Sequence, residues 1–152
     1  MDSTLKHGVL TELECQRSFI DLGCSISVPI CNFERYDFIA DVDGHLIRVQ
    51  CKSAIKAKDS DAIYISCRTQ TINTNGISRR TYSKKEIDYF ATFWDGKCYL
   101  IPVEDCSTVK YIRFIPPNNN QWSQITWGPD YELEQVLHCI RTGSKISKTI
   151  KM

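Results

Sequence analysis

Apolar residues recur at helical spacing near both ends of the chain. A first helix is predicted over Gly8–Leu22, and Gly23 is expected to end it. The buried face of this helix is expected to contain Cys15, Phe19 and Leu22, widened by Val9, Leu13 and Ile20. A second helix is predicted near the carboxyl end by the spacing of Leu133, Val136, Leu137 and Ile140.

Between the two helices the pattern changes to short runs typical of β-strands. Asp43-Gly44 separates two such runs and is typical of a two-residue type I′ turn, and Asp95-Gly96 predicts a second hairpin. Further strands are predicted over Ser25–Pro29, Ala62–Cys67 and Tyr111–Ile115. The order helix, sheet, helix predicts an α/β fold with a mixed β-sheet flanked by helices.

Length and composition fit one globular domain. The chain has 152 residues, of which 42% are hydrophobic and 24% are charged. We expect one domain over residues 1–152, with a flexible tail after about Gly143. Because no apolar run could span a bilayer and no apolar signal core follows Met1, we expect a cytoplasmic protein without a membrane partner.

The predicted Asp43-Gly44 turn fixes which residues oppose each other in the first hairpin. Val42 would face His45, and Asp37 would face Gln50 on the same side of the sheet. Lys52, two residues beyond Gln50, shares that side. The hairpin is therefore expected to gather Asp37, Gln50 and Lys52, provided that no bulge shifts the register.

Such a group suits hydrolysis of a phosphate ester. Carboxylate and amide oxygens are ligands for Mg²⁺, and a lysine can orient a water molecule or stabilise charge on phosphorus. Glu12 and Glu14 are the candidates for a second carboxylate, and Glu12 borders the apolar face of the first helix. The alternative interpretation is a solvated sheet surface. None of the eight cysteines forms a Cys-x-x-Cys pair, which argues against a zinc ribbon or a redox motif. Most of them have apolar neighbours in the sequence and are interpreted as small core residues.

Tyr36-Asp37 followed by Gln50-Cys51-Lys52 resembles the signature of the PD-(D/E)XK nuclease superfamily, with Gln50 at a position that is usually acidic. A wider pattern resembles a small bacterial branch that includes homing endonucleases of group I introns. It runs from about residue 6 to residue 135 and includes Gly8-x-x-x-Glu12-Leu13, Tyr82-Ser83-Lys84-Lys85-Glu86 and Tyr99-Leu100-Ile101-Pro102-Val103.

The resemblance assigns roles to matching residues. It implies that Asp37 is the central metal ligand, that Glu12 is a helix carboxylate assisting with metal, and that Lys52 is the catalytic lysine. Gln50 would occupy the acidic ligand position, and the backbone carbonyl of Cys51 would face the metal. The implied cofactor is Mg²⁺ or another divalent cation such as Mn²⁺.

The resemblance also implies a bacterial, site-specific endonuclease that cuts both strands of a long duplex site in intron homing. Cutting both strands requires two active sites, so a homo-oligomer is expected, at least a dimer and, by the closer likeness, a tetramer. The loops 56–61 and 75–80 are candidates for base recognition. Candidate DNA-binding residues are Arg35, Lys56, Lys58, Asn75, Arg79, Arg80, Lys84 and Lys85.

Three alternatives stay open. A Holliday-junction resolvase, or a restriction or repair nuclease, would share the same core. A non-catalytic DNA-binding module is a third alternative, because the neutral Gln50 weakens the metal site. The net charge of only +1 argues mildly against nucleic acid, although the placement of charge matters more than its sum.

Overall fold

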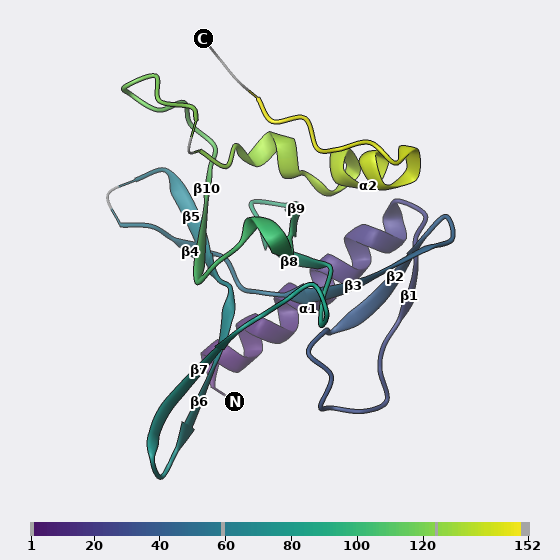
Figure 1. Cartoon of the computed structure of the whole chain (residues 1–152), viewed down its shortest axis with the longest axis vertical. Helices are drawn as coiled ribbons and strands as arrows, with labels where there is room; N and C mark the ends of the chain where they lie inside the picture. The colour runs from purple at the N-terminus through teal and green to yellow at the C-terminus, as the bar shows by residue number, and fades with distance from the viewer. Residues whose placement is uncertain (1, 59, 124, 150–152) are drawn as a thin grey trace.

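Two helices and a five-stranded mixed sheet form the centre of the computed structural model, which describes residues 2–58, 60–123 and 125–149 (Figure 1). Neighbouring strands of this sheet are antiparallel except for the parallel pair β3 and β8. The strand order is β1 (Ser25–Ser27), β2 (Phe38–Val42), β3 (His45–Cys51), β8 (Tyr89–Trp94) and β9 (Lys97–Pro102). The predicted α/β fold with a mixed sheet is confirmed.

A second, three-stranded sheet covers one face of the first. It consists of β10 (Val109–Arg113), β5 (Ala62–Ser66) and β4 (Ile55–Lys56). The strand predicted over Tyr111–Ile115 is thus displaced by two residues, because β10 pairs with β5 only from Val109 to Arg113.

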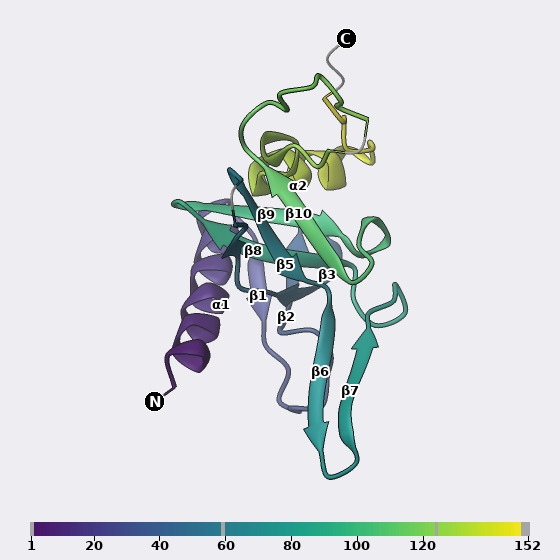
Figure 2. The ribbon, with the colours of Figure 1, turned by 90° about the vertical axis from the view of Figure 1, so that its left-hand side faces the viewer.

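The third sheet of the structure was not predicted from the sequence. β6 (Arg68–Asn73) and β7 (Gly76–Thr81) form a two-stranded ribbon that projects from the rest of the molecule (Figure 2). All six residues of β7 are exposed. The available signal was Asn75-Gly76, a dipeptide that favours a hairpin turn. The observed turn, Thr74-Asn75, lies one residue earlier, between the paired residues Asn73 and Gly76.

Helix α1 (Ser3–Asp21) begins five residues earlier than predicted, because the Asp2 carboxylate accepts a hydrogen bond from the Thr4 backbone N–H at 2.9 Å. It ends as expected at Gly23, which has φ 87°. The N–H groups of Gly23 and Cys24 donate to carbonyl oxygens in the last turn, completing a Schellman motif.

The side of α1 that packs on the sheet is narrower than predicted. Cys15 and Phe19 are fully buried, and the Phe19 ring meets the Phe38 ring edge-on at 5.3 Å. The burial predicted for Val9, Leu13 and Ile20 is wrong, since more than half of each residue is exposed. These three residues and Leu5, which is also exposed, form an apolar surface that we call the helix stripe.

The five-stranded sheet separates two hydrophobic clusters. One contains buried residues of α1, the sheet and α2 (Leu133–Thr142), which confirms the second helix. The other lies between the sheet and strands β5 and β10. Short 3₁₀ turns occupy Val103–Asp105 and Gly128–Tyr131.

The segment after Gly143 contains no helix or strand among its described residues. Ile146 nevertheless packs against both clusters, and the backbone N–H of Thr149 donates to Asp130 Oδ2 at 2.7 Å. The flexibility of this tail stays a prediction. No helix in the described residues combines the length and apolarity needed to cross a membrane.

Candidate functional site

The first hairpin forms with the predicted turn and register. Val42 lies opposite His45, and Phe38 lies opposite Val49. Asp43 and Gly44 have φ values of 51° and 92°, the positive values that a type I′ turn requires. The sequence therefore determines which residues of β3 face the two sides of the sheet.

Asp37 departs from that register. Its backbone N–H donates to the Val49 carbonyl at 2.8 Å, although Val49 is already the partner of Phe38. Two consecutive residues thus oppose one, which is the arrangement of a β-bulge. The predicted direct pairing of Asp37 with Gln50 is wrong, because the bulge re-aims Asp37. Asp37 Oδ2 instead accepts the Cys51 backbone N–H at 2.7 Å.

Lys52 remains beside Asp37 despite the bulge. The Lys52 backbone N–H donates to the Ala91 carbonyl at 2.9 Å, which fixes the residue against β8. Its ammonium lies 5.1 Å from the centre of the Tyr82 ring and 3.4 Å from the Arg68 carbonyl oxygen. Burial lowers the pKa of Lys52, and the negative charge of Asp37 opposes that shift.

Glu12 approaches the same place from α1. Burial raises the pKa of Glu12, and the Asp37 charge raises it further. Burial also raises the pKa of Asp37, while the hydrogen bond from Cys51 and the charge of Lys52 act in the opposite direction. The carboxylates of Glu12 and Asp37, of which the Asp37 charge raises the pKa of Glu12, together form an acidic site that favours a cation.

The other two proposed ligands meet at the end of β3. Gln50 Nε2 lies 3.3 Å from the Cys51 carbonyl oxygen, to which it donates. The Cys51 thiol points to the opposite side of the sheet, where it contacts Cys15 in the first cluster. All eight cysteines are free thiols, and six of them are buried, which confirms the core interpretation for most of them. Cys31 is exposed and Cys106 is half-buried, so these two do not fit it.

These residues offer oxygen donors that fit a hard cation. In the described residues, Asp37 Oδ1 has no hydrogen bond, and no three side chains of the types His, Cys, Asp or Glu gather as a metal site. A divalent cation would thus need the Gln50 amide and the Cys51 carbonyl beside the carboxylates of Glu12 and Asp37. Carboxylate, amide and carbonyl oxygens are suitable ligands for Mg²⁺.

Arg35, predicted to bind DNA, is engaged within the protein. Its guanidinium donates to Glu86 Oε1 at 2.9 Å, to the Thr81 carbonyl at 2.6 Å and to Thr69 Oγ1 at 3.0 Å. It also stacks 3.7 Å from the centre of the Tyr82 ring. Arg35 therefore ties the loop before Asp37 to the base of the ribbon.

Tyr82 was not assigned a role by the sequence, although it lies within the motif pattern. Its ring contacts Arg35, Lys52 and, edge-on at 5.2 Å, Phe90. Burial raises the pKa of Tyr82, so its hydroxyl stays protonated at neutral pH. No sequence signal for this contact existed, because it joins residues distant along the chain.

The remaining basic candidates lie on the surface. The side chains predicted to bind DNA at the ribbon and its flanks are exposed: Lys56, Lys58, Asn75, Arg79, Arg80, Lys84 and Lys85. In the other candidate loop, Lys56 is the last residue of β4, and residues 57–58 and 60–61 belong to the β4–β5 connection. Position 59 lies outside the described residues. Ser83–Glu86 forms a single turn, in which Glu86 accepts the Ser83 backbone N–H as a capping box would.

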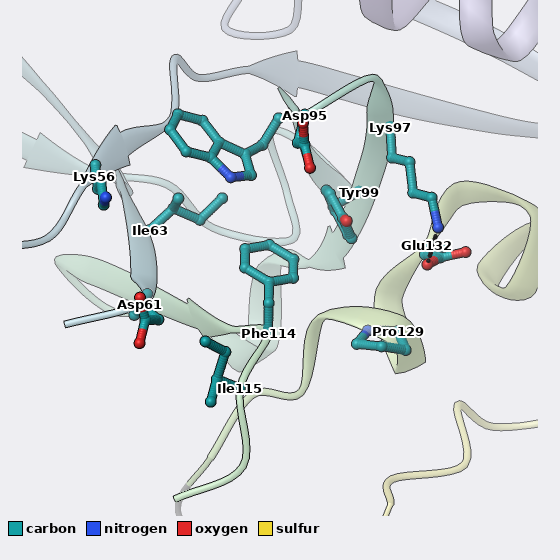
Figure 3. A pocket seen from close by; sticks show the side chains of 12 residues that line it. Lys56, Asp61, Ile63, Asp95, Lys97, Tyr99, Phe114, Ile115, Pro129 and Glu132 are labelled. Atoms are coloured by element: carbon teal, nitrogen blue, oxygen red, sulfur yellow. Dashed lines mark hydrogen bonds and ion pairs between the residues drawn. The ribbon is translucent and has the colours of Figure 1, made fainter.

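Lys56 also lines a pocket of about 430 Å³ between the two sheets' ends (Figure 3). Aromatic residues Tyr99 and Phe114 face one another in it at 5.3 Å, and Lys97 pairs with Glu132 at 3.0 Å. None of Glu12, Asp37, Gln50 and Lys52 lines this pocket. The candidate site is therefore separate from it.

Comparisons with known proteins agree with this arrangement. The family model described as PD-(D/E)XK endonuclease matches residues 2–134, which confirms the resemblance noted in the sequence. Among solved structures, the bacterial homing endonuclease I-Ssp6803I is similar, with a TM-score of 0.74 and 18% sequence identity. The alignment covers 93% of this chain and 97% of that one, and at this identity it shows a shared fold. No curated protein matches the chain in sequence.

Proposed function

Because this chain belongs to the PD-(D/E)XK endonuclease family and is a DNA endonuclease, we propose that it cuts both strands of one long, specific DNA site. We also propose that the cut depends on Mg²⁺ or Mn²⁺ and serves homing of a group I intron. The proposed setting is the bacterial cytoplasm, where such DNA is accessible.

The observation that carries the proposal is the position of Asp37. A bulge and the Cys51 N–H hold its Oδ2, its Oδ1 stays available, and Lys52 and Glu12 interact with its charge. A carboxylate with a free oxygen beside a second carboxylate and a lysine supports cation-dependent hydrolysis. It is not the arrangement expected for a solvated sheet surface.

Each residue has a distinct role in the proposed reaction. Asp37 and Glu12 would hold the cation with the Gln50 amide oxygen and the Cys51 carbonyl. A divalent cation bound there supplies polarisation of the phosphate and a lower pKa for a bound water. Lys52 would orient the attacking water and stabilise the charge that develops on the phosphate oxygens.

The Gln50 amide distinguishes this site from one with an acidic residue at that position. An amide oxygen is neutral, so the site carries one negative charge fewer. We propose that Glu12 compensates for this loss. Gln50→Glu should then retain cleavage, and Glu12→Ala should reduce cleavage far more than Glu14→Ala. A folded but inactive Gln50→Glu variant would show that the amide NH₂ has a role of its own.

We propose that the protein acts as a homo-oligomer, at least a dimer and as a full assembly a tetramer. The helix stripe supports a contact with a second copy, since an exposed apolar stripe on one helix suits a symmetric interface. Leu13→Glu should lower the mass measured by light scattering, whereas Arg17→Glu, on an exposed neighbouring position, should not. An unchanged mass for Leu13→Glu would exclude the stripe as the interface.

We propose that the β6–β7 ribbon enters the major groove. The groove admits a two-stranded ribbon, and Asn75, Arg79 and Arg80 carry hydrogen-bond donors for bases or phosphates. Lys56, Lys58, Lys84 and Lys85 would contact the backbone of the duplex on either side. Arg35 is retained in this proposal as the residue that orients the ribbon.

The test is to digest genomic DNA from bacteria that encode members of this family and to map the DNA ends that the protein produces. Digestion with Mg²⁺ is compared with digestion in EDTA, and Lys52→Ala is compared with Lys145→Ala, which removes an exposed positive charge elsewhere. We expect one defined double-strand cut that needs Mg²⁺ and Lys52 but not Lys145.

Other outcomes would replace the proposal. Cleavage of four-way junctions of any sequence, with no defined duplex cut, would identify a resolvase. Cuts at many short sites would identify a restriction or repair nuclease. Binding of duplex DNA without any metal-dependent cut would identify a non-catalytic binding module. The neutral Gln50 would then explain the loss of the metal site.

A further inference from the structure

The two faces of the β6–β7 ribbon differ in their neighbours. Because side chains alternate along each strand, Thr69 and Arg80 share one face. Thr69 Oγ1 accepts a hydrogen bond from Arg35 at 3.0 Å, and the Arg80 guanidinium donates to Glu86 Oε2 at 2.8 Å. This face is therefore fixed to the body of the protein at the base of the ribbon.

The opposite face is free of such contacts. Arg68 and Thr81 form the pair of this face at the base of the ribbon. Beyond it the face presents two cross-strand pairs, Gln70 with Arg79 and Ile72 with Ile77. Arg79 Nε donates to Gln70 Oε1 at 3.4 Å, and in the described residues neither side chain has another partner. We call these four residues the open face.

The isoleucine pair of the open face lies outside the hydrophobic core. Ile72 is 75% exposed and Ile77 is 56% exposed, and neither belongs to either hydrophobic cluster. The corresponding pair on the other face is Thr71 with Ser78. Polar residues of this kind at positions 72 and 77 would also be compatible with the two strands. Two opposed isoleucines near the tip of a polar arm are therefore suited to an apolar contact with a partner.

The major groove of DNA offers one apolar group in a polar surrounding. That group is the C5-methyl of thymine, and neighbouring base edges present hydrogen-bond donors and acceptors. Glutamine and arginine can hydrogen-bond to the edges of adenine and guanine. The open face carries the matching set, an apolar pair beside a Gln–Arg pair.

The spacing of the two pairs also fits. Residues on one face of a strand are two positions apart, or about 7 Å along the ribbon. That length corresponds to about two base-pair steps at 3.4 Å each. A ribbon lying along the groove would place both pairs against bases of one half-site.

We propose that Ile72 and Ile77 contact thymine methyl groups in the target, and that Gln70 and Arg79 hydrogen-bond to purines about two base pairs away. This rests on the proposed function and specifies how that function recognises its site. The partner is duplex DNA with a thymine at this position, rather than a second copy of the chain.

The test replaces each thymine of the mapped target duplex, one at a time, by deoxyuridine, which lacks only the methyl group. Binding of the complete protein is measured by fluorescence anisotropy with Ca²⁺ in place of Mg²⁺ to prevent cleavage. We expect a loss of about fourfold in affinity at one or two adjacent thymines in each half-site, the value expected for one buried methyl.

Variants connect this loss to the open face. The Ile72→Ser/Ile77→Ser double variant should bind more weakly and lose its sensitivity to deoxyuridine at those positions. Ile72→Val/Ile77→Val keeps branched apolar side chains and should retain the sensitivity. Thr71→Ser, on the fixed face, serves as the matched control and should behave as the original protein.

Three results would overturn the proposal. One is an original protein insensitive to deoxyuridine at every thymine, and another is a double serine variant that keeps the full sensitivity. The third is a double serine variant whose mass changes while its deoxyuridine profile does not, since the isoleucines would then contact another copy. All three results are obtained on a mapped target, so each overturns this proposal while the proposed function stands. A protein that makes no defined cut instead refutes the proposed function, so the two failures are distinguishable.

Discussion

Replacing Arg35 by alanine should loosen the connection between the active-site loop and the ribbon. Arg35 lies two residues before Asp37, and its guanidinium bonds to Glu86, Thr81 and Thr69. The substitution removes all of these contacts at once. Arg80→Ala is the matched control, because Arg80 pairs with the other carboxylate oxygen of the same Glu86 at 2.8 Å.

The magnitudes expected for the two variants differ because their burial differs. The side chains of Arg35 and Glu86 are 15% and 20% exposed, whereas that of Arg80 is 69% exposed. A shielded charged hydrogen bond contributes about 1.5–3 kcal/mol, and stacking on Tyr82 adds about 0.5–1 kcal/mol. We therefore expect Arg35→Ala to lower the free energy of unfolding by about 2–4 kcal/mol and Arg80→Ala by less than about 1 kcal/mol.

Urea denaturation followed by tryptophan fluorescence measures both changes. Cleavage of the mapped target is measured in parallel below the denaturation midpoint. We expect Arg35→Ala to cut more slowly and at more sites, because both Asp37 and the ribbon lose their common support. Arg35→Lys should be intermediate, since one ammonium cannot replace the several donors of a guanidinium.

Equal losses of stability for the two alanine variants would refute this reasoning, because they would show that burial does not set the strength of the Glu86 contacts. An Arg35→Ala protein that is destabilised but cuts its site with unchanged rate and specificity would refute the link between Arg35 and the active site.

Three further predictions concern the sheet and the site. Thr92 Oγ1 is buried and has no hydrogen bond in the described residues, so Thr92→Val should raise the free energy of unfolding by about 1 kcal/mol in urea denaturation; a loss would contradict this. Burial and the Asp37 charge raise the pKa of Glu12, so its carboxyl group contributes stability at low pH that is lost as pH rises through its folded pKa. Glu12→Gln should therefore raise the melting temperature at neutral pH. It should not do so below pH 4.5, the ordinary pKa of a glutamate carboxyl. A gain that persists at low pH would show that the charge of Glu12 is not its cause. The Tyr82 ring lies near the Lys52 ammonium, so Tyr82→Leu should lower kcat about tenfold, while Tyr82→Phe, which keeps the ring, should stay within about twofold; equal effects would show that the ring does not position Lys52.

The two Asp-Gly dipeptides were sufficient to predict two hairpins of the fold and the turn of each. Asp43-Gly44 and Asp95-Gly96 lie in the two predicted hairpin turns, each with positive φ at both residues. In the structure, the same register places Ile47 and Val49 in the core. These features were predictable because a two-residue turn determines the pairing of the strands beside it.

Features that depend on distant contacts were not predictable. No distinctive residue type marks the bulge at Asp37. Because of this bulge, the Asp37 carboxylate accepts the Cys51 N–H instead of lying opposite Gln50 as predicted. Helical spacing could not show that the sheet covers only one side of α1, so Leu13 was assigned to the core. The sequence also could not show that Glu86 lies beside Arg35.

The ribbon was missed for a different reason. Its strands are mostly polar, and four residues of β6 and all six of β7 are exposed, so they lack the alternation of apolar and polar residues that marks a half-buried strand. Asn75-Gly76 was the one strong local signal, and the observed turn, Thr74-Asn75, lies one residue before it. Exposed β-ribbons are more readily predicted from their turn than from their strands.

The central claim is that Asp37 is the residue around which metal-dependent hydrolysis takes place. The most direct measurement compares cleavage rates of the mapped duplex by the original protein, Asp37→Ala and Asp21→Ala across a Mg²⁺ titration, with DNA affinity measured alongside. We predict that Asp37→Ala loses about a hundredfold or more in rate at every Mg²⁺ concentration while its affinity stays within about tenfold, and that Asp21→Ala matches the original protein. An Asp37→Ala protein that folds, binds DNA and cuts near the original rate would contradict the account.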